Sequence, residues 1–371
     1  MDFALSEPQE MLKRLARDFL TEKCPKSLVR KMEEDEKGYS PQLWQEMAEL
    51  GWIGLAFPEK YGGGEGSFLD LIVLLEEMGR ACLPSPFLST VILGAGPILD
   101  LGSEAQKQDF LPQVVQGKRI LTLALTEPSA RYDAAGIQVQ AIPDKDSYII
   151  SGTKLFVPDA HIADYLVYAT RTKEGVTLFL MDAKSNGIAY IPLQTIGGDK
   201  QFEVTFTGMR VARENMLGEL GGGWTTIEQT LEKAALAKCA ELVGGAQQVL
   251  EMTVSYTKQR VQFERPVGSF QAVQHHCADM VINLDGAKFL TYEAAWRLSE
   301  GLPYRKEISM AKSWTNEACR QVNFYGHTVI GGVGVIIDHD MPLYSRRAKA
   351  GELLFGDATF HREIVAQEMG L

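Results

Sequence analysis

The sequence has few cysteines, no block of basic residues and no long uncharged hydrophobic run. Its five cysteines are odd in number, widely spaced and without a CxxC pair, which speaks against a disulfide framework or a cysteine zinc site. The net charge of -11 speaks against sequence-independent nucleic-acid binding, which needs a basic face. No segment reaches membrane-spanning length without charge, and the start MDFALSEPQEMLKRL lacks the basic and apolar regions of a secretory signal. We therefore expect a cytoplasmic protein.

The chain has 371 residues, which is enough for two or three domains with a large core. Its composition, 45% hydrophobic and 23% charged residues, is that of an ordinary globular protein. Serines that can cap helices occur at Ser6, Ser40, Ser67 and Ser103, each followed by an apolar helical pattern. These signals predict an N-terminal α-helical domain over residues 1–116.

The hydrophobic period changes from helical to alternating near Lys118. Short β-branched and aromatic runs, separated by Gly, Asn, Asp and Pro, then continue to about residue 220. This pattern predicts a middle antiparallel β-sandwich or barrel over residues 117–220. Beyond Gly221 the helical period returns, with long helices expected over 224–260, 267–298 and 305–329. The whole chain is thus predicted to be α+β and multidomain, ending in a four-helix-bundle-like domain over residues 221–371.

Between the first two long helices lies the segment YTKQRVQFERPVGSFQAVQHHCADM, residues 256–280. Pro266 cannot occupy the middle of a helix, so we expect a helix-helix corner there that presents Arg260, Gln262, Arg265 and Gln271. On the residues alone, a solvated corner and a site for an anion or another chain both remain open.

Other motifs give little indication of a ligand, a metal or a reaction. The glycine-rich loop at residues 57–66 has no following Lys-Ser/Thr, so a connector is favoured over a phosphate cradle. The adjacent His275 and His276 point to different helix faces and cannot form a helical metal pair. We predict no metal site. The basic cluster of Arg346, Arg347 and Lys349 fits either a face toward CoA or a partner subunit, or a solvated helix end.

The 256–280 segment, with its pattern YxxxRxxFxRPxGxFQAxQHxxADM, resembles a signature of the acyl-CoA dehydrogenase superfamily. Residues 125–136, 150–169, 216–224 and 331–349 resemble further motifs of that family, in the same order. The resemblance implies the family's three-domain fold, an FAD cofactor and α,β-dehydrogenation of an acyl-CoA thioester. A glutamate removes the α-proton in that reaction, and the flavin accepts a hydride from the β-carbon.

Several positions match the family's FAD-binding residues, and the resemblance implies that some of them act across a subunit interface. The implied cofactor-binding set is Thr126, Arg260, Phe263, Gln271, Gly331, Gly332 and Gly334. Other positions depart from the pattern. Arg131-Tyr132 stands where the family has Gly-Ser, and Pro158 stands where a threonine hydroxyl would meet the flavin. Thr328 replaces the family's glutamine, and Glu264 replaces a glycine.

The largest departure concerns the catalytic base. Phe355 and Ala234 occupy the two positions at which the family carries its glutamate, and Ala235 replaces the accompanying arginine. The catalytic residue is therefore unknown. Weak substitutes are Asp357 and Glu352, which read more readily as solvated surface acids, and Glu241, whose helix-interior position better suits a buried structural partner of a basic residue.

The combination of retained FAD-binding positions with a missing catalytic base resembles the small or base-lacking subunits of heteromeric acyl-CoA dehydrogenases. The expected function is FAD-dependent oxidation of an acyl-CoA at a CH–CH bond, in the degradation of fatty or other carboxylic acids, with a base supplied by a partner. The alternative is an acyl-CoA-binding or lyase-like member of the same fold that performs no net oxidation. Expected partners are an acyl-CoA, a second copy or a related subunit in a homo-oligomer or heterotetramer, and an electron-transfer flavoprotein.

Overall fold

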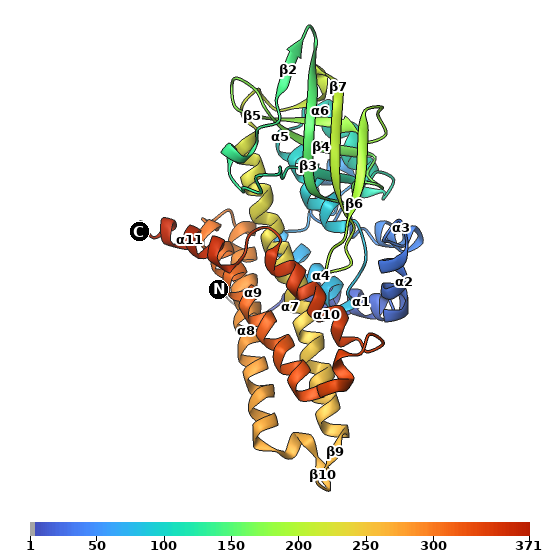
Figure 1. Cartoon of the computed structure of the whole chain (residues 1–371), viewed down its shortest axis with the longest axis vertical. Coiled ribbons are helices and arrows are strands. Elements are labelled where there is room, and N and C mark those ends of the chain that lie inside the picture. Colours follow the sequence, from blue (N-terminus) through green and yellow to red (C-terminus); the bar gives the residue numbers. More distant parts are fainter. Residues whose placement is uncertain (1–3) are drawn as a thin grey trace.

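The computed structural model describes residues 4–371 as a helical part, a β domain and a bundle of long helices (Figure 1). The N-terminal helices are α1 (Glu7–Lys23), α2 (Lys26–Glu34), α3 (Pro41–Glu49), α4 (Phe68–Ala81), α5 (Ala95–Leu101) and α6 (Glu104–Val115). Between α4 and α5 runs a π-helical segment, η2 (Leu88–Gly94). The predicted order of helical, β and helical parts is confirmed. The boundaries at 116/117 and 220/221 stay a prediction.

The predicted helix starts are confirmed, because they depend on local hydrogen bonds. Ser6, Ser67 and Ser103 each form a capping box, and Ser40 accepts a hydrogen bond from the backbone of Leu43 at the start of α3. Helix α2 was not predicted. It follows Pro25, which offers no side-chain cap, so the sequence carries no start signal there.

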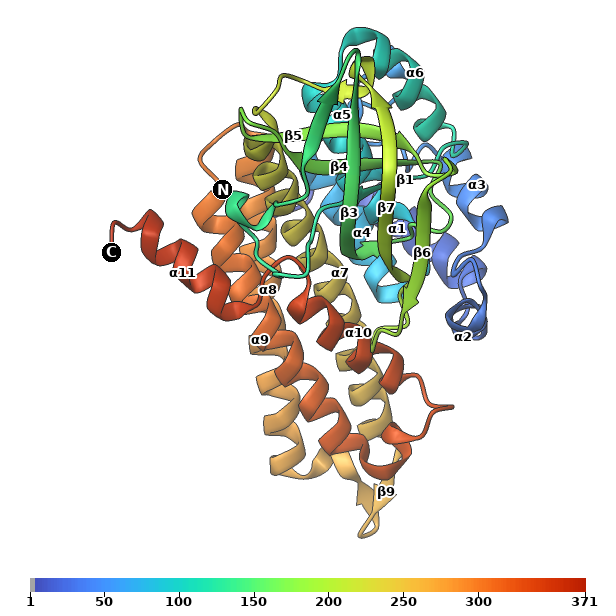
Figure 2. The same cartoon turned by 45° about the horizontal axis from the view of Figure 1, so that its top comes forward.

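The β domain contains two sheets that stack face to face, with their strands crossing (Figure 2). One sheet has the order β1 (Leu121–Ala124), β4 (Tyr165–Arg171), β5 (Val176–Asp182) and β8 (Met216–Leu217). The other has the order β2 (Ala141–Asp144), β3 (Ser147–Pro158), β7 (Gln201–Ala212) and β6 (Ile188–Leu193). Buried side chains from both sheets, such as Tyr148, Phe179 and Phe206, fill the space between them.

Two details of the predicted sheet were wrong. Pairing is antiparallel except between β1 and β4, which run parallel, because the long crossover of β2 and β3 separates them in sequence. The runs DSYIISG and KLFV, which the sequence pattern predicts as two short strands separated at Gly152, form the single strand β3. Its register shifts between Ile150 and Gly152 and again before Val157. These bulges bend β3 without ending it.

The C-terminal part is built on α7 (Gly223–Gln259), α8 (Gln271–Ser299) and α9 (Arg305–Ile330), followed by η6 (Gly331–Val335), α10 (Met341–Leu353) and α11 (Ala358–Glu368). The connection between α7 and α8 corrects the sequence-based expectation. A small hairpin of β9 (Val261–Gln262) and β10 (Arg265–Pro266) projects from the tip of the bundle in place of a helix-helix corner (Figure 1). Its two turn residues, Phe263 and Glu264, have φ of 52° and 64°. Such positive values at both positions define a type I′ turn.

Helices α4 and α7 cross with their backbones in direct contact. A β-carbon at Gly79 would overlap the carbonyl oxygen of Glu241, and one at Gly244 would overlap the carbonyl oxygen of Glu76. Only glycine allows this approach. The crossing joins the N-terminal helices to the bundle and fixes how closely they pack. Among the described residues, no helix is both long enough and apolar enough to cross a membrane.

Candidate functional site

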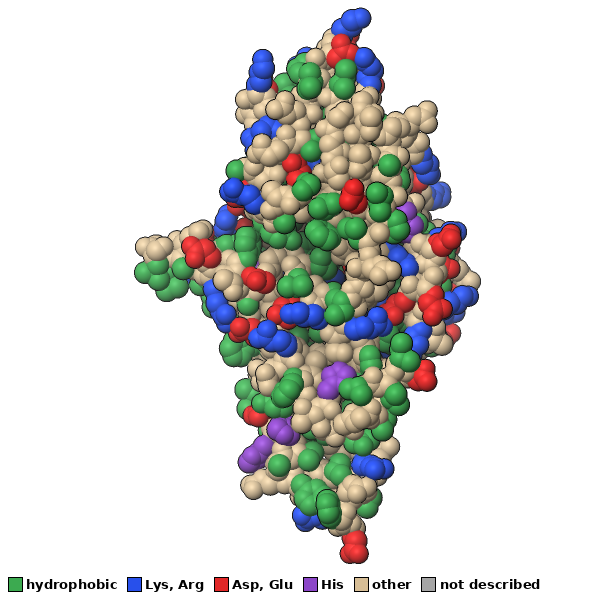
Figure 3. Space-filling view, viewed as in Figure 1, with side chains coloured by type: hydrophobic (Ala, Val, Ile, Leu, Met, Phe, Trp, Pro, Cys, Tyr) green, Lys and Arg blue, Asp and Glu red, His purple; other side chains and the backbone are tan. Residues whose placement is uncertain are grey.

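A cavity of about 240 Å³ lies where the N-terminal helices, the β domain and the bundle meet. Figure 3 shows hydrophobic side chains around a hollow at this junction. Its apolar wall comes from η2, α7 and the end of α10, and includes Leu88, Leu93, Leu231, Leu242 and Leu354. Such a largely apolar pocket with a few polar groups is the usual form of a small-molecule site.

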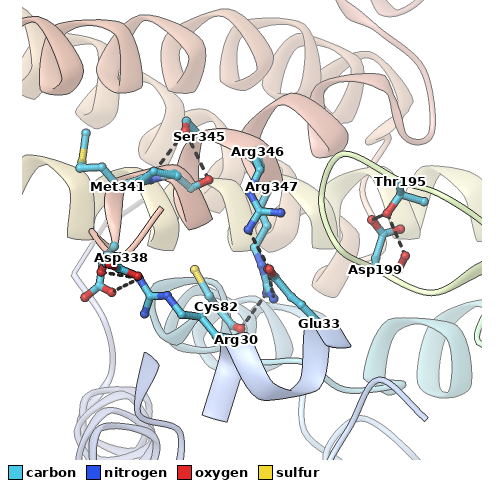
Figure 4. A network of polar contacts seen from close by, with 12 residues as sticks. Arg30, Glu33, Cys82, Thr195, Asp199, Asp338, Met341, Ser345, Arg346 and Arg347 are labelled. Carbon is cyan, nitrogen blue, oxygen red and sulfur yellow. Dashed lines mark hydrogen bonds and ion pairs between the residues drawn. The ribbon is translucent and has the colours of Figure 1, made fainter. Parts of the chain in front are cut away.

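Polar side chains line the opposite parts of the cavity. Lys238, on α7, forms a close ion pair with Glu241 one turn further along the helix. Glu33, on α2, accepts a hydrogen bond from Arg346 of α10 at 2.7 Å and lies 3.8 Å from Arg347 (Figure 4). The pair of arginines therefore faces α2, not open solvent, and ties two distant segments together.

Asp159 also lines the cavity, although no sequence motif points to it. It follows Pro158 at the end of β3, has a φ of 53°, and accepts a hydrogen bond from Ser89 Oγ at 2.6 Å. Burial of the carboxyl group raises its pKa to about 7, and the negative charge of Asp199 adds to this effect. A left-handed backbone and a perturbed carboxyl group in a cavity make Asp159 a candidate functional residue.

Phe355 and Ala234, the two positions that the resemblance assigns to the catalytic glutamate, carry no side-chain group that can accept a proton. Phe355 lines the cavity, and Ala234 is fully buried in α7. The Phe355 carbonyl accepts a hydrogen bond from His361 Nε2 at 2.9 Å, which holds the loop between α10 and α11. Burial lowers the pKa of His361 to about 4, so the imidazole is neutral at physiological pH.

Two of the positions that depart from the family's pattern, Tyr132 and Pro158, also line this cavity. Tyr132 packs on Phe360, with ring centroids 5.7 Å apart, and burial raises the pKa of its hydroxyl group. Pro158 offers no donor, and its carbonyl is occupied by Thr122 Oγ1 at 2.6 Å. Thr126 lies half-buried at the cavity wall, and its hydroxyl has no hydrogen bond to any described residue.

The rest of the predicted cofactor set lies far from Thr126 in this chain. Arg260, Phe263 and Gln271 are exposed at the hairpin tip, at the opposite end of the bundle from the β domain (Figure 1). Gly331, Gly332 and Gly334 follow the end of α9. Within the described residues, the side chains of Arg260 and Gln271 form no hydrogen bond or ion pair. These free polar groups fit an FAD only if Thr126 of one chain and the hairpin of another contribute to the same site.

The weak substitutes for the missing base fall into two groups. Glu241 lines the cavity and is paired with a base, as expected. The interpretation of Glu352 as a surface acid was wrong. It is buried and pairs with Arg320 at 3.0 Å and Lys349 at 3.2 Å, because α9 and α10 pack together there. Asp357 is the N-cap of α11 and accepts a hydrogen bond from Phe360. Neither of these two lines the cavity.

Sequence reasoning missed Lys238 as well as Asp159. Lys238 did leave a signal, since it is the one charged side chain within the helical run AALAKCA. Asp159 left none, because its burial depends on η2, a segment that is distant in sequence.

Family models match most of the chain. Residues 6–118, 122–209 and 221–370 match models described as the N-terminal, middle and C-terminal domains of acyl-CoA dehydrogenase. The short-chain specific acyl-CoA dehydrogenase of Megasphaera elsdenii is 33% identical, with 96% of each chain covered. The caffeyl-CoA reductase-Etf complex subunit CarC of Acetobacterium woodii is 30% identical, covering 97% of this chain and 98% of that one.

A solved structure shows the same architecture. A chain of the ChsE4-ChsE5 complex from Mycobacterium tuberculosis superposes with a TM-score of 0.92 at 29% identity, covering 100% of this chain and 99% of the other.

Proposed function

Because this chain belongs to the acyl-CoA dehydrogenase family, we propose that it acts on an acyl-CoA thioester as an FAD-dependent CH–CH oxidoreductase subunit that lacks its own catalytic glutamate. FAD is the cofactor, as in the family, and supplies the hydride acceptor when bound. Thr126 of one chain, together with Arg260, Phe263 and Gln271 of another, would hold it.

The observation that carries the proposal is the absence of a proton acceptor at Phe355 and Ala234. Oxidation of an acyl-CoA requires a base for the α-proton while a hydride leaves the β-carbon. Among the described residues, four carboxyl groups line the cavity, and each already has a partner. Glu241 and Glu33 pair with cations, Asp159 accepts a hydrogen bond from Ser89, and Asp199 accepts hydrogen bonds from Thr195 and Gln201. We infer that the base belongs to a related subunit, which would complete a heteromeric assembly. An electron-transfer flavoprotein would then take the electrons.

A second candidate is a non-dehydrogenating protein that binds acyl-CoA or acts as a lyase. Tyr132 and Pro158 favour it, since both reduce the space or the donors available to a flavin ring within the cavity. An absorption spectrum separates the two candidates. Flavin bands that bleach with an acyl-CoA support dehydrogenation, and a colourless protein that binds CoA esters supports the alternative.

The decisive experiment compares the chain alone with the chain co-expressed with related subunits encoded in the same genome. Loss of a positioned base costs about 10²- to 10⁴-fold in rate, so the homo-oligomer should show little or no oxidation of straight-chain acyl-CoA esters with an artificial acceptor. The co-purified complex should show turnover. The partner expressed alone serves as the control. Robust turnover by the homo-oligomer would contradict the proposal and direct attention to Asp159 and Glu241.

A further inference from the structure

The polar part of the cavity carries a lysine in an unusual setting. Lys238 projects from α7 between buried neighbours, with Ala234, Ala235 and Cys239 below 2% exposed and Leu242 one turn further on. Its side chain is 17% exposed, and that exposed surface faces the cavity. Placing an ammonium group in such surroundings costs free energy unless hydrogen bonds replace its water shell.

The groups around Lys238 supply both charge and hydrogen-bonding capacity. Glu241 pairs with it directly, and Asp159 lies close enough for the cation to lower the pKa of that carboxyl group. Ser89 Oγ completes this cluster through its hydrogen bond to Asp159. The cluster therefore offers ammonium donors and carboxylate acceptors to whatever part of a ligand reaches it.

The charges of the cavity restrict what that part can be. The charged side chains that line it, among the described residues, are the carboxylates Glu33, Asp159, Asp199 and Glu241 and the cations Lys200, Lys238 and Arg347. Because the pKa of Asp159 is raised to about 7, these acids and bases nearly balance in charge, and no excess of positive charge remains to neutralise an added carboxylate. A plain hydrocarbon chain would displace the water around Lys238 and Glu241, and it could not replace the hydrogen bonds that these side chains make with that water.

We propose that the acyl group bound in this cavity carries an uncharged oxygen substituent, a hydroxyl or keto group, which hydrogen-bonds to Lys238 beside Glu241. A hydroxyl can accept from the ammonium group and donate to a carboxylate of the cluster, and a keto oxygen can accept alone. This inference rests on the proposed function, since it assumes that an acyl-CoA enters the cavity.

The test measures binding to the flavin-containing assembly by equilibrium dialysis. The probes are hexanoyl-CoA, its 4-, 5- and 6-hydroxy and 5-oxo derivatives, and adipoyl-CoA, which has the same chain length but ends in a carboxylate. The best oxygenated probe should bind about tenfold more tightly than hexanoyl-CoA, as one charge-assisted hydrogen bond allows. Adipoyl-CoA should bind no more tightly than hexanoyl-CoA.

Variants locate the effect. Lys238→Met should remove the preference for the oxygenated probe while hexanoyl-CoA still binds. If this variant folds poorly because Glu241 loses its partner, the double variant Lys238→Met, Glu241→Leu replaces the whole pair by apolar side chains and should show the same loss. Lys233→Met is the matched control. Lys233 lies on the same helix and pairs with Asp100 at 3.3 Å outside the cavity, so the preference should remain.

The outcomes are distinct. Equal or tighter binding of hexanoyl-CoA than of every oxygenated probe would overturn this inference and leave the proposed function standing. Tightest binding of adipoyl-CoA would overturn the assignment of an uncharged group. A preference that survives both Lys238 variants would overturn the role of the lysine. Failure of every CoA ester to bind would overturn the proposed function and this inference together.

Discussion

At the scale of single residues, Asp159 combines two unfavourable features at one cavity wall. Its backbone is left-handed, with a φ of 53°, and its carboxyl group is largely removed from solvent. A non-glycine residue in this conformation costs about 1 kcal/mol or more, although aspartate and asparagine tolerate it best. Asparagine is therefore the substitution that removes the charge and keeps the backbone.

The raised pKa of Asp159 predicts a pH-dependent effect on stability. Below the ordinary aspartate pKa the carboxyl group is protonated in both folded and unfolded chains. Between there and pH 7 only the unfolded chain ionises it, so the folded wild type loses stability as the pH rises. Asp159→Asn avoids this loss. Its stability relative to wild type should increase by about 2 kcal/mol between pH 5 and pH 8, measured by chemical denaturation. A constant difference across this range would contradict the assignment.

Arg260 leads to a prediction about cofactor retention. If it pairs with an FAD pyrophosphate held mainly by a neighbouring chain, Arg260→Ala should weaken FAD binding by about ten- to a hundredfold, since a charge-assisted hydrogen bond is lost. Arg260→Lys should restore binding only in part, because an ammonium group cannot form two parallel hydrogen bonds. The flavin-to-protein ratio after dialysis measures both.

Lys258→Ala is the matched control, because Lys258 is also exposed and lies two residues earlier at the end of α7. Unchanged flavin content in Arg260→Ala would remove this residue from the interface. Circular dichroism should show that both variants remain folded.

At the scale of elements, the hairpin at the bundle tip contains a turn that its sequence does not favour. Both turn residues of a type I′ hairpin need positive φ, and glycine is preferred at the second, where this chain has Glu264. Glu264→Gly should stabilise the hairpin by about 0.5–1 kcal/mol, visible as slower amide hydrogen exchange over residues 261–266. Glu264→Ala keeps a β-carbon and should give no such gain. Equal protection in both variants would show that the turn is unstrained.

The sequence predicted those elements whose signals are local. The capped helices begin where Ser6, Ser67 and Ser103 indicate, and the change of hydrophobic period marks the β domain. Helix α2 was missed because Pro25 supplies no side-chain cap, and the hairpin was missed because its turn lacks the glycine that usually marks a type I′ turn. The η2 segment is buried, and tertiary packing there overrides local preference. Within the site, motif resemblance located Phe355 and Ala234. The burial of Glu352 and the pairing of Asp159 with Ser89 depend on contacts between distant segments and could not be read from the sequence.

At the scale of the whole molecule, the bundle carries large apolar side chains that are exposed on the single chain. Large exposed apolar side chains on the hairpin, α8, α9 and the segment after η6 include Phe263, Ile282, Phe324 and Ile337. Such clusters generally mark an interface. We predict a dimer or a dimer of dimers through the bundle.

Light scattering should therefore give at least twice the chain mass of 41.0 kDa at micromolar concentration. Phe324→Glu should shift the population toward the monomer, because a charge cannot be buried at an apolar interface without a partner. Ile142→Glu is the control, since Ile142 is 57% exposed but lies on β2 in the other half of the molecule. A monomeric wild type would rule out this assembly.

Where α4 and α7 cross, the residues that set the spacing of the helices differ from those that supply side chains to the cavity. The distance between these helices is fixed by backbone contacts at Gly79 and Gly244, whereas Leu231, Lys238 and Leu242 contribute side chains to the cavity. Those three positions can therefore be varied together while the helix spacing is retained. A combinatorial library at these positions, built on unchanged glycines, is a direct route to redirecting the acyl preference of this scaffold.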